Sequence, residues 1–138
     1  MTRAALAAAV VLAAGVAAAY TPDVDYALEC QGCHRADGAG TPGTIPTLRG
    51  AVARFLTVDG GREYLARVPG VAQAPLDDVA LAAVLNWMLA RFDPAGVPAG
   101  FAPYTAAEVG RLRTRPLVDV ATERTRLLHA VARDATAR

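Results

Sequence analysis

The clearest periodic pattern of apolar residues lies between positions 77 and 92. Its members recur at steps of three and four residues, which places them on one face of an α-helix. They are Leu81, Val84, Leu85, Met88 and Phe92, and Trp87 lies beside them. Asp77 and Asp78 precede the pattern, where negative charge stabilises the positive end of a helix. We therefore predict a helix that ends at Phe92 and buries this stripe.

Two further helices are expected in the first half of the chain. Thr21-Pro22-Asp23 is typical of a helix start, and this helix would bring Tyr26 and Leu28 into the core. A second helix is predicted over residues 62–68, after the break at Gly60-Gly61. Residues 35–43 and 68–76 are rich in glycine, proline or both, and are expected to be loops.

The last third of the chain begins with a run of helix breakers. Pro94, Gly96, Pro98, Gly100 and Pro103 forbid a continuous helix. Thr105 and Glu108 then have the spacing of a capping box, which predicts a helix to about position 113, and a second helix is expected over residues 118–133. We interpret residues 94–138 as a helical C-terminal extension of a domain that spans residues 20–93.

The first nineteen residues differ in character from the rest. A single positive charge at Arg3 precedes an apolar run to Ala18, and three alanines stand before Tyr20. This is the layout of a secretory signal peptide, so residues 1–19 are expected to direct export. The apolar run is short for a membrane span of about 20 residues. The protein is expected at the membrane only if this segment stays uncleaved.

Charge is balanced overall but unevenly distributed. Beyond residue 19 the chain has 13 arginines, 13 acidic residues and no lysine. Residues 20–93 carry a net charge of −3 and residues 94–138 a net charge of +3. A neutral chain of this kind gives no indication of nucleic-acid binding, whereas local patches suit a protein partner.

The chemistry of the chain is concentrated in Cys30-Gln31-Gly32-Cys33-His34, which contains its only two cysteines. A Cys-x-x-Cys-His motif is the attachment site of c-type haem. Cys30 and Cys33 would form the covalent links to the cofactor, and His34 would be the proximal iron ligand. The motif therefore predicts one haem c.

Other uses of a Cys-x-x-Cys pair fit less well. A structural zinc needs four ligands, and the only other histidine, His129, cannot supply the two that are missing. A thioredoxin-like dithiol belongs beside a βαβ pattern, which this chain rich in alanine and leucine does not show. A disulfide without a cofactor would close a very short loop and stabilise little.

With Thr44 to Gly50 the chain resembles the class I cytochromes c: an N-terminal CxxCH, a glycine-rich loop, and then Pro46-x-Leu48-x-Gly50. The resemblance spans residues 23–92 and implies an all-α class I cytochrome c fold. It implies that the Pro46 carbonyl accepts a hydrogen bond from the His34 ring, that Leu48 touches the haem, and that Trp87 packs near the haem edge. A ligating histidine commonly has such an acceptor for its second ring nitrogen.

The chain departs from this family at the distal iron ligand. The family usually places a methionine in the loop before the last helix of the haem domain, and here that loop offers only Gln73 and backbone groups. Met88 and His129 are the remaining candidates. Met88 also fits the role of a core residue, because it belongs to the apolar stripe of its helix. An open or water-occupied sixth position is the further alternative.

Three arginines are candidates to lie near a haem propionate, because a guanidinium group binds a carboxylate through two parallel hydrogen bonds. They are Arg49, Arg54 and Arg62.

These features favour a periplasmic mono-haem carrier of single electrons, not itself an enzyme, either free or as the haem subunit of a periplasmic dehydrogenase. Its expected partner is a redox protein such as a periplasmic dehydrogenase or oxidase. The alternative is a five-coordinate haem protein that binds a small ligand or acts on peroxide.

Overall fold

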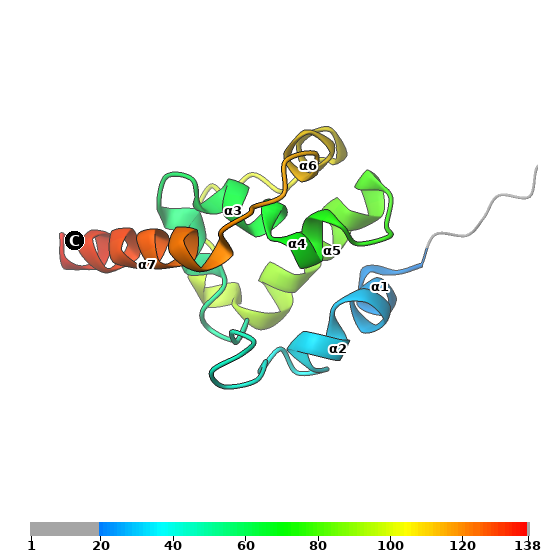
Figure 1. Cartoon of the computed structure of the whole chain (residues 1–138), viewed down its shortest axis with the longest axis horizontal. Helices are drawn as coiled ribbons and strands as arrows, with labels where there is room; N and C mark the ends of the chain where they lie inside the picture. The colour runs from blue at the N-terminus through cyan, green and yellow to red at the C-terminus, as the bar shows by residue number, and fades with distance from the viewer. Residues whose placement is uncertain (1–19, 138) are drawn as a thin grey trace, which may run out of the picture.

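The computed structural model describes residues 20–137, so the predicted signal peptide lies outside the described residues. The described part of the chain is helical, and its only β feature is an isolated bridge between Thr41 and Ile45. This confirms the predicted all-α class. Figure 1 shows the elements, which are α1 (Pro22–Glu29), α2 (Gln31–His34), η1 (Ala53–Thr57), α3 (Gly61–Arg67), α4 (Pro69–Ala72), α5 (Asp78–Phe92), η2 (Pro94–Gly96), α6 (Ala106–Arg113) and α7 (Val120–Thr136).

Helix α5 forms the centre of the core, as its apolar pattern predicted. The Asp77 carboxylate accepts a hydrogen bond of 2.7 Å from the Ala80 N–H and so caps the helix. All five residues of the predicted stripe are buried. At the far end, the buried Asp93 carboxylate accepts a 2.8 Å hydrogen bond from the Ala53 N–H, which fixes the start of η1 against the end of α5.

Helix α1 packs against α5 through aromatic rings. The Tyr26 ring centroid lies 5.2 Å from that of Trp87 and 5.1 Å from that of Phe92. Such tilted pairs stabilise beyond the area they bury. The prediction that Leu28 packs in the core was wrong, because its side chain is 62% exposed. Leu28 is two residues from Tyr26, and on a helix that spacing points the two side chains to different faces.

The prediction of a plain loop over residues 68–76 also needs correction. Pro69 begins the short helix α4, where its fixed φ and missing N–H suit the first helical turn. Helix α3 forms close to its predicted position, and both helices contribute buried residues.

The C-terminal segment packs on the rest of the chain. Tyr104, Val109 and Leu127 are buried in the same apolar cluster as the α5 stripe. Helix α7 begins two residues later than predicted and continues to Thr136. No helix of residues 20–137 is long and apolar enough to cross a membrane.

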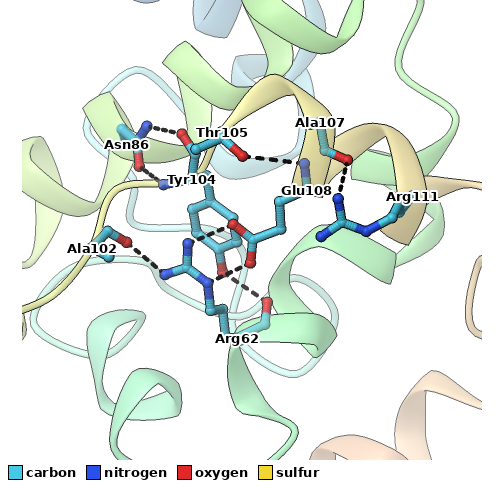
Figure 2. Close-up of polar contacts among 8 residues, drawn as sticks. All are labelled: Arg62, Asn86, Ala102, Tyr104, Thr105, Ala107, Glu108 and Arg111. Atoms are coloured by element: carbon cyan, nitrogen blue, oxygen red, sulfur yellow. Dashed lines mark hydrogen bonds and ion pairs between the residues drawn. The ribbon is translucent and has the colours of Figure 1, made fainter.

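Half of the predicted capping box forms. The Thr105 hydroxyl accepts a 3.2 Å hydrogen bond from the Glu108 N–H at the start of α6. The Glu108 carboxylate does not turn back to the cap. It accepts hydrogen bonds instead from the Nε and Nη2 atoms of Arg62 on α3, at 2.5 and 2.7 Å, and Figure 2 shows this pair. A bidentate ion pair with an arginine is stronger than a neutral cap bond, so tertiary structure overrides the local motif.

Candidate haem-binding site

The Cys-x-x-Cys-His motif lies where α1 ends and α2 begins. Cys30 closes α1 with a 2.9 Å hydrogen bond from its N–H to the Tyr26 carbonyl, and the His34 N–H bonds to the Cys30 carbonyl at 3.0 Å. The one-turn helix α2 therefore fixes the spacing of the two thiols and the imidazole. Both cysteines are free; Cys30 is half-buried and Cys33 exposed. Burial, with smaller contributions from nearby acidic groups, raises the pKa of Cys30 to about 11, which keeps this thiol protonated.

The His34 ring is half-buried against the loop that carries Pro46. Burial lowers the pKa of His34, and the Pro46 carbonyl beside the ring opposes this shift. The His34 Nδ1 atom is buried and completes no hydrogen bond among the described residues. The carbonyl that raises the pKa of His34 thus belongs to Pro46, the residue that the family resemblance implied. Because Nδ1 is buried in the protein, Nε2 is the ring nitrogen that remains to bind iron.

A tight turn places Pro46 at this position. The Gly40 N–H donates a 3.0 Å hydrogen bond to the His34 carbonyl, and Thr41 exchanges two 2.8 Å hydrogen bonds with Ile45. Gly40 has φ +68°, and a Cβ at this residue would clash with the Ile45 carbonyl oxygen and lie 2.7 Å from that of Pro46. Glycine is therefore required where the two arms of the turn meet.

Leu48 and Trp87, the other two predicted haem contacts, are both partly buried beside the core. The Leu48 N–H bonds to the Gly38 carbonyl at 2.8 Å, which ties it to the loop after His34. The Trp87 ring lies 5.6 Å from Phe92 in an edge-on arrangement. Their contact with haem stays a prediction.

The segment where the family usually has a distal methionine is held by an arginine from α6. The Arg113 guanidinium donates hydrogen bonds to the carbonyls of Ala72 at 3.1 Å, Ala74 at 2.5 Å and Leu76 at 2.7 Å. It also forms a 3.2 Å ion pair with Asp78. Sequence reasoning did not single out Arg113, because nothing in its neighbourhood along the chain indicates these partners.

The candidate distal ligands occupy contrasting surroundings. Met88 is buried within the apolar core, which supports its interpretation as a packing residue. His129 is exposed on α7, and Gln73 is exposed at the end of α4. The identity of a distal ligand stays a prediction.

The three arginines proposed for a propionate differ in their partners. Arg49 forms an exposed ion pair with Asp37 at 3.1 Å, and Arg62 is engaged by Glu108. Arg54 has no ion pair among the described residues, and its Nε atom is buried without a hydrogen-bond partner. Only Arg54 is thus left available to a carboxylate.

The residues present fit a covalently bound haem c. Two free thiols and an imidazole meet at one helix junction, and the buried Nδ1 faces a carbonyl-bearing loop. A zinc site fits less well, because no three His, Cys, Asp or Glu side chains of residues 20–137 form a cluster that could hold a metal ion.

The chain is similar to two curated proteins, both named cytochrome c-552 and both from Thermus thermophilus. The first is 37% identical over 139 residues, which is 86% of this chain and 94% of that protein. The second is 39% identical over 119 residues, which is 72% of this chain and 91% of that protein. No family model matches the chain.

The extent of the first match corrects one expectation. Residues 1–93 are only about two thirds of the 138 residues, so a match over 86% of the chain includes part of residues 94–138. The sequence motifs alone indicated a resemblance that ends at residue 92. The match shows that the similarity to known proteins continues into the C-terminal extension.

Proposed function

Because this chain belongs to the class I mono-haem cytochrome c family, we propose that it is an exported carrier that moves single electrons between redox proteins of the periplasm. It works either free or as the haem-bearing subunit of a periplasmic dehydrogenase. The observation that carries the proposal is the junction of α1 and α2, where Cys30, Cys33 and His34 meet beside the Pro46 carbonyl.

Haem c, when bound, supplies an iron that gains and loses one electron. The chain's own residues hold and shield it. Cys30 and Cys33 are the covalent attachment points, and His34 is the proximal ligand. The Pro46 carbonyl lies beside the His34 ring and would accept a hydrogen bond from its Nδ1–H in the holoprotein, which would orient the ring. Hydrogen bonding of this kind is one of the means by which a protein tunes an iron site.

The periplasmic location rests on the N-terminal sequence. Residues 1–19 have the charge and apolar run of a signal peptide, and haem attachment to a CxxCH motif is expected outside the cytoplasm. A redox protein partner such as a dehydrogenase or oxidase would meet the surface beside the exposed Cys33.

The proposal is tested by expressing the full chain with a c-type haem attachment system and separating the periplasmic fraction on a denaturing gel stained for haem. We expect one haem-stained band in that fraction, and its loss when Cys30 and Cys33 are both changed to alanine. Haem that dissociates on the gel, or a stained band confined to the cytoplasm, would overturn the proposal.

A second function is favoured by residues 68–76, where the family usually has its distal methionine. This segment contains no methionine, and its Gln73 side chain is exposed. In this alternative the protein binds a small ligand or acts on peroxide through an open sixth position. Rapid, tight binding of carbon monoxide to the reduced protein, together with negligible electron exchange with other carriers, would favour it over the electron carrier.

A further inference from the structure

Arg35, which directly follows His34, has a strained backbone. Its φ of 65° and ψ of 164° lie in a region that is essentially restricted to glycine. Among residues 20–137 it is the only residue other than glycine with a positive φ. Such a conformation costs free energy and persists only where the surrounding contacts hold it. The contacts of Arg35 therefore identify what fixes the chain beside His34.

The contacts that hold Arg35 are hydrogen bonds of its backbone, and its side chain is exposed. The Arg35 N–H donates a 2.7 Å hydrogen bond to the Gln31 carbonyl and so closes α2. The Arg35 carbonyl accepts two hydrogen bonds, at 2.8 Å from the Tyr26 hydroxyl and at 3.2 Å from the Gly38 N–H. The shorter of these two bonds comes from another helix, because Tyr26 belongs to α1.

Tyr26 is a firmly held donor. It is buried, and its ring centroid lies 5.2 Å from that of Trp87 and 5.1 Å from that of Phe92, both on α5. Burial, with smaller contributions from Cys30 and Asp37, raises the pKa of Tyr26 to about 12. The hydroxyl therefore keeps its proton at physiological pH and remains able to donate. The ring packs in the core, while the hydroxyl reaches a single backbone carbonyl.

The turn after His34 is continuous with the loop that carries Pro46. The Gly40 N–H donates a 3.0 Å hydrogen bond to the His34 carbonyl, and the Leu48 N–H donates one of 2.8 Å to the Gly38 carbonyl. These bonds tie both arms of the loop to the turn, and Pro46 lies between them in the chain. A turn that changed its conformation would therefore move the His34 backbone and the Pro46 carbonyl beside the His34 ring.

We propose that Tyr26 is a positioning residue for the proximal haem ligand: its hydroxyl holds the strained Arg35 carbonyl and thereby fixes His34 against the core. This role rests on the proposed function, because it takes His34 as the iron ligand. It also gives Tyr26 a task that its ring packing does not explain, since phenylalanine would fill the same space without the hydroxyl.

Loss of the hydroxyl is expected to let the turn relax. The 3.2 Å bond from Gly38 would be the only hydrogen bond left on the Arg35 carbonyl among the described residues. The Pro46 carbonyl would then be held less firmly at the His34 ring. A ligating histidine is more basic when its second ring nitrogen donates to an acceptor, so weakening this contact is expected to raise the reduction potential of the iron.

Tyr26→Phe tests the proposal, because it keeps the ring and removes only the hydroxyl. Tyr104→Phe is the matched control: Tyr104 is also buried, and its hydroxyl donates at 2.7 Å to a backbone carbonyl, that of Arg62 on α3. Both variants are measured as purified holoproteins, by amide hydrogen exchange and by reduction potential. We expect the Gly38 and Gly40 amides to exchange about five- to tenfold faster in Tyr26→Phe than in Tyr104→Phe. We expect the potential to rise in Tyr26→Phe alone.

Arg35→Gly provides a second background, because glycine adopts the same φ and ψ without strain. In this background the turn is expected to keep its conformation without the hydroxyl. Adding Tyr26→Phe to Arg35→Gly should therefore change neither the potential nor the exchange at Gly40. Comparing the double variant with Arg35→Gly cancels the effect of the lost arginine charge.

Three results would overturn the proposal. The first is exchange at Gly38 and Gly40 that is the same in Tyr26→Phe and Tyr104→Phe. The second is faster exchange without a change in potential, which would show that the hydroxyl acts on stability alone. The third is a Tyr26→Phe effect of equal size in both backgrounds, because the hydroxyl would then not act through the strained turn. Wild-type protein without covalent haem would instead refute the proposed function, and with it the role of His34 on which this proposal rests.

Discussion

At the scale of single residues, the site depends on a glycine that carries no functional group. Gly40 combines a positive φ with a close approach to the Ile45 and Pro46 carbonyls. Gly43, three residues on, has φ +78° but no atom within 4 Å of an added Cβ. The two positions therefore share the same backbone requirement and differ only in the space around them.

Gly40→Ala is expected to destabilise the protein more than Gly43→Ala. The left-handed backbone costs each alanine about 1–2 kcal/mol, and the clash at Gly40 adds roughly 1–3 kcal/mol. Urea unfolding of the holoproteins measures both losses. Equal free energies of unfolding for the two variants would show that the turn does not need the close contact.

The sequence predicts some site residues and not others for a physical reason. Cys30, Cys33 and His34 are adjacent in the chain, so their spacing alone indicates their shared chemistry. Arg113 donates a hydrogen bond to Asp78, which lies 35 positions earlier in the chain, and the Arg124 guanidinium lies 5.4 Å from the centroid of the Phe55 ring. Such contacts depend on how α6 and α7 pack, which local patterns do not encode.

At the scale of secondary-structure elements, α6 acts on the segment between α4 and α5 through one side chain. Arg113 is largely buried and donates hydrogen bonds to three backbone carbonyls that accept none from the N–H groups of a helix or strand. Buried carbonyl groups without partners are costly. The conformation of this segment, which carries no distal methionine, therefore depends on the C-terminal extension.

Arg113→Ala is expected to lower the free energy of unfolding by about 2–4 kcal/mol, because several charge-assisted hydrogen bonds are lost and the carbonyls stay buried. Arg111→Ala is the matched control: Arg111 is exposed on the same helix and bonds only to the Ala107 carbonyl. This variant is expected to change stability by less than about 0.5 kcal/mol. Faster amide hydrogen exchange over residues 72–78 in Arg113→Ala alone would support the account, and similar exchange in both variants would contradict it.

Most elements could be predicted because their signals are local. The apolar stripe and Asp77 cap define α5, and Thr105 marks the start of α6. The pattern failed where tertiary contacts decide the outcome. The Glu108 carboxylate pairs with Arg62 and does not complete the predicted capping box. Helix α4 has only four residues, which is too short to show helical periodicity in the sequence.

At the scale of the whole molecule, the extension is bound to the haem domain by both apolar and polar contacts. The Tyr104 hydroxyl donates to the Arg62 carbonyl at 2.7 Å, and Asn86 of α5 exchanges two hydrogen bonds with the Tyr104 backbone (Figure 2). The Arg62–Glu108 pair, with side chains 26% and 21% exposed, lies beside them. Loss of this pair is therefore expected to affect the stability of the whole chain.

Glu108→Gln is expected to lower the free energy of unfolding by about 1–2 kcal/mol at pH 7. Arg62 lowers the pKa of Glu108 from its usual value of 4.5. A depressed folded-state pKa means that the stabilisation is complete above about pH 4.5 and is lost as pH falls through the lower, folded-state pKa. Urea unfolding between pH 3 and 7 should therefore show the gap between wild type and Glu108→Gln closing at acid pH, and a gap that is constant with pH would contradict the pairing.

The most direct test of the account is a potentiometric titration of the purified holoprotein, followed by its haem absorption. We predict that one haem per chain is reduced and reoxidised reversibly in a single wave that fits the Nernst equation for one electron. A wave that is irreversible, that accounts for only part of the haem, or that needs more than one electron would contradict the assignment of this protein as a mono-haem electron carrier.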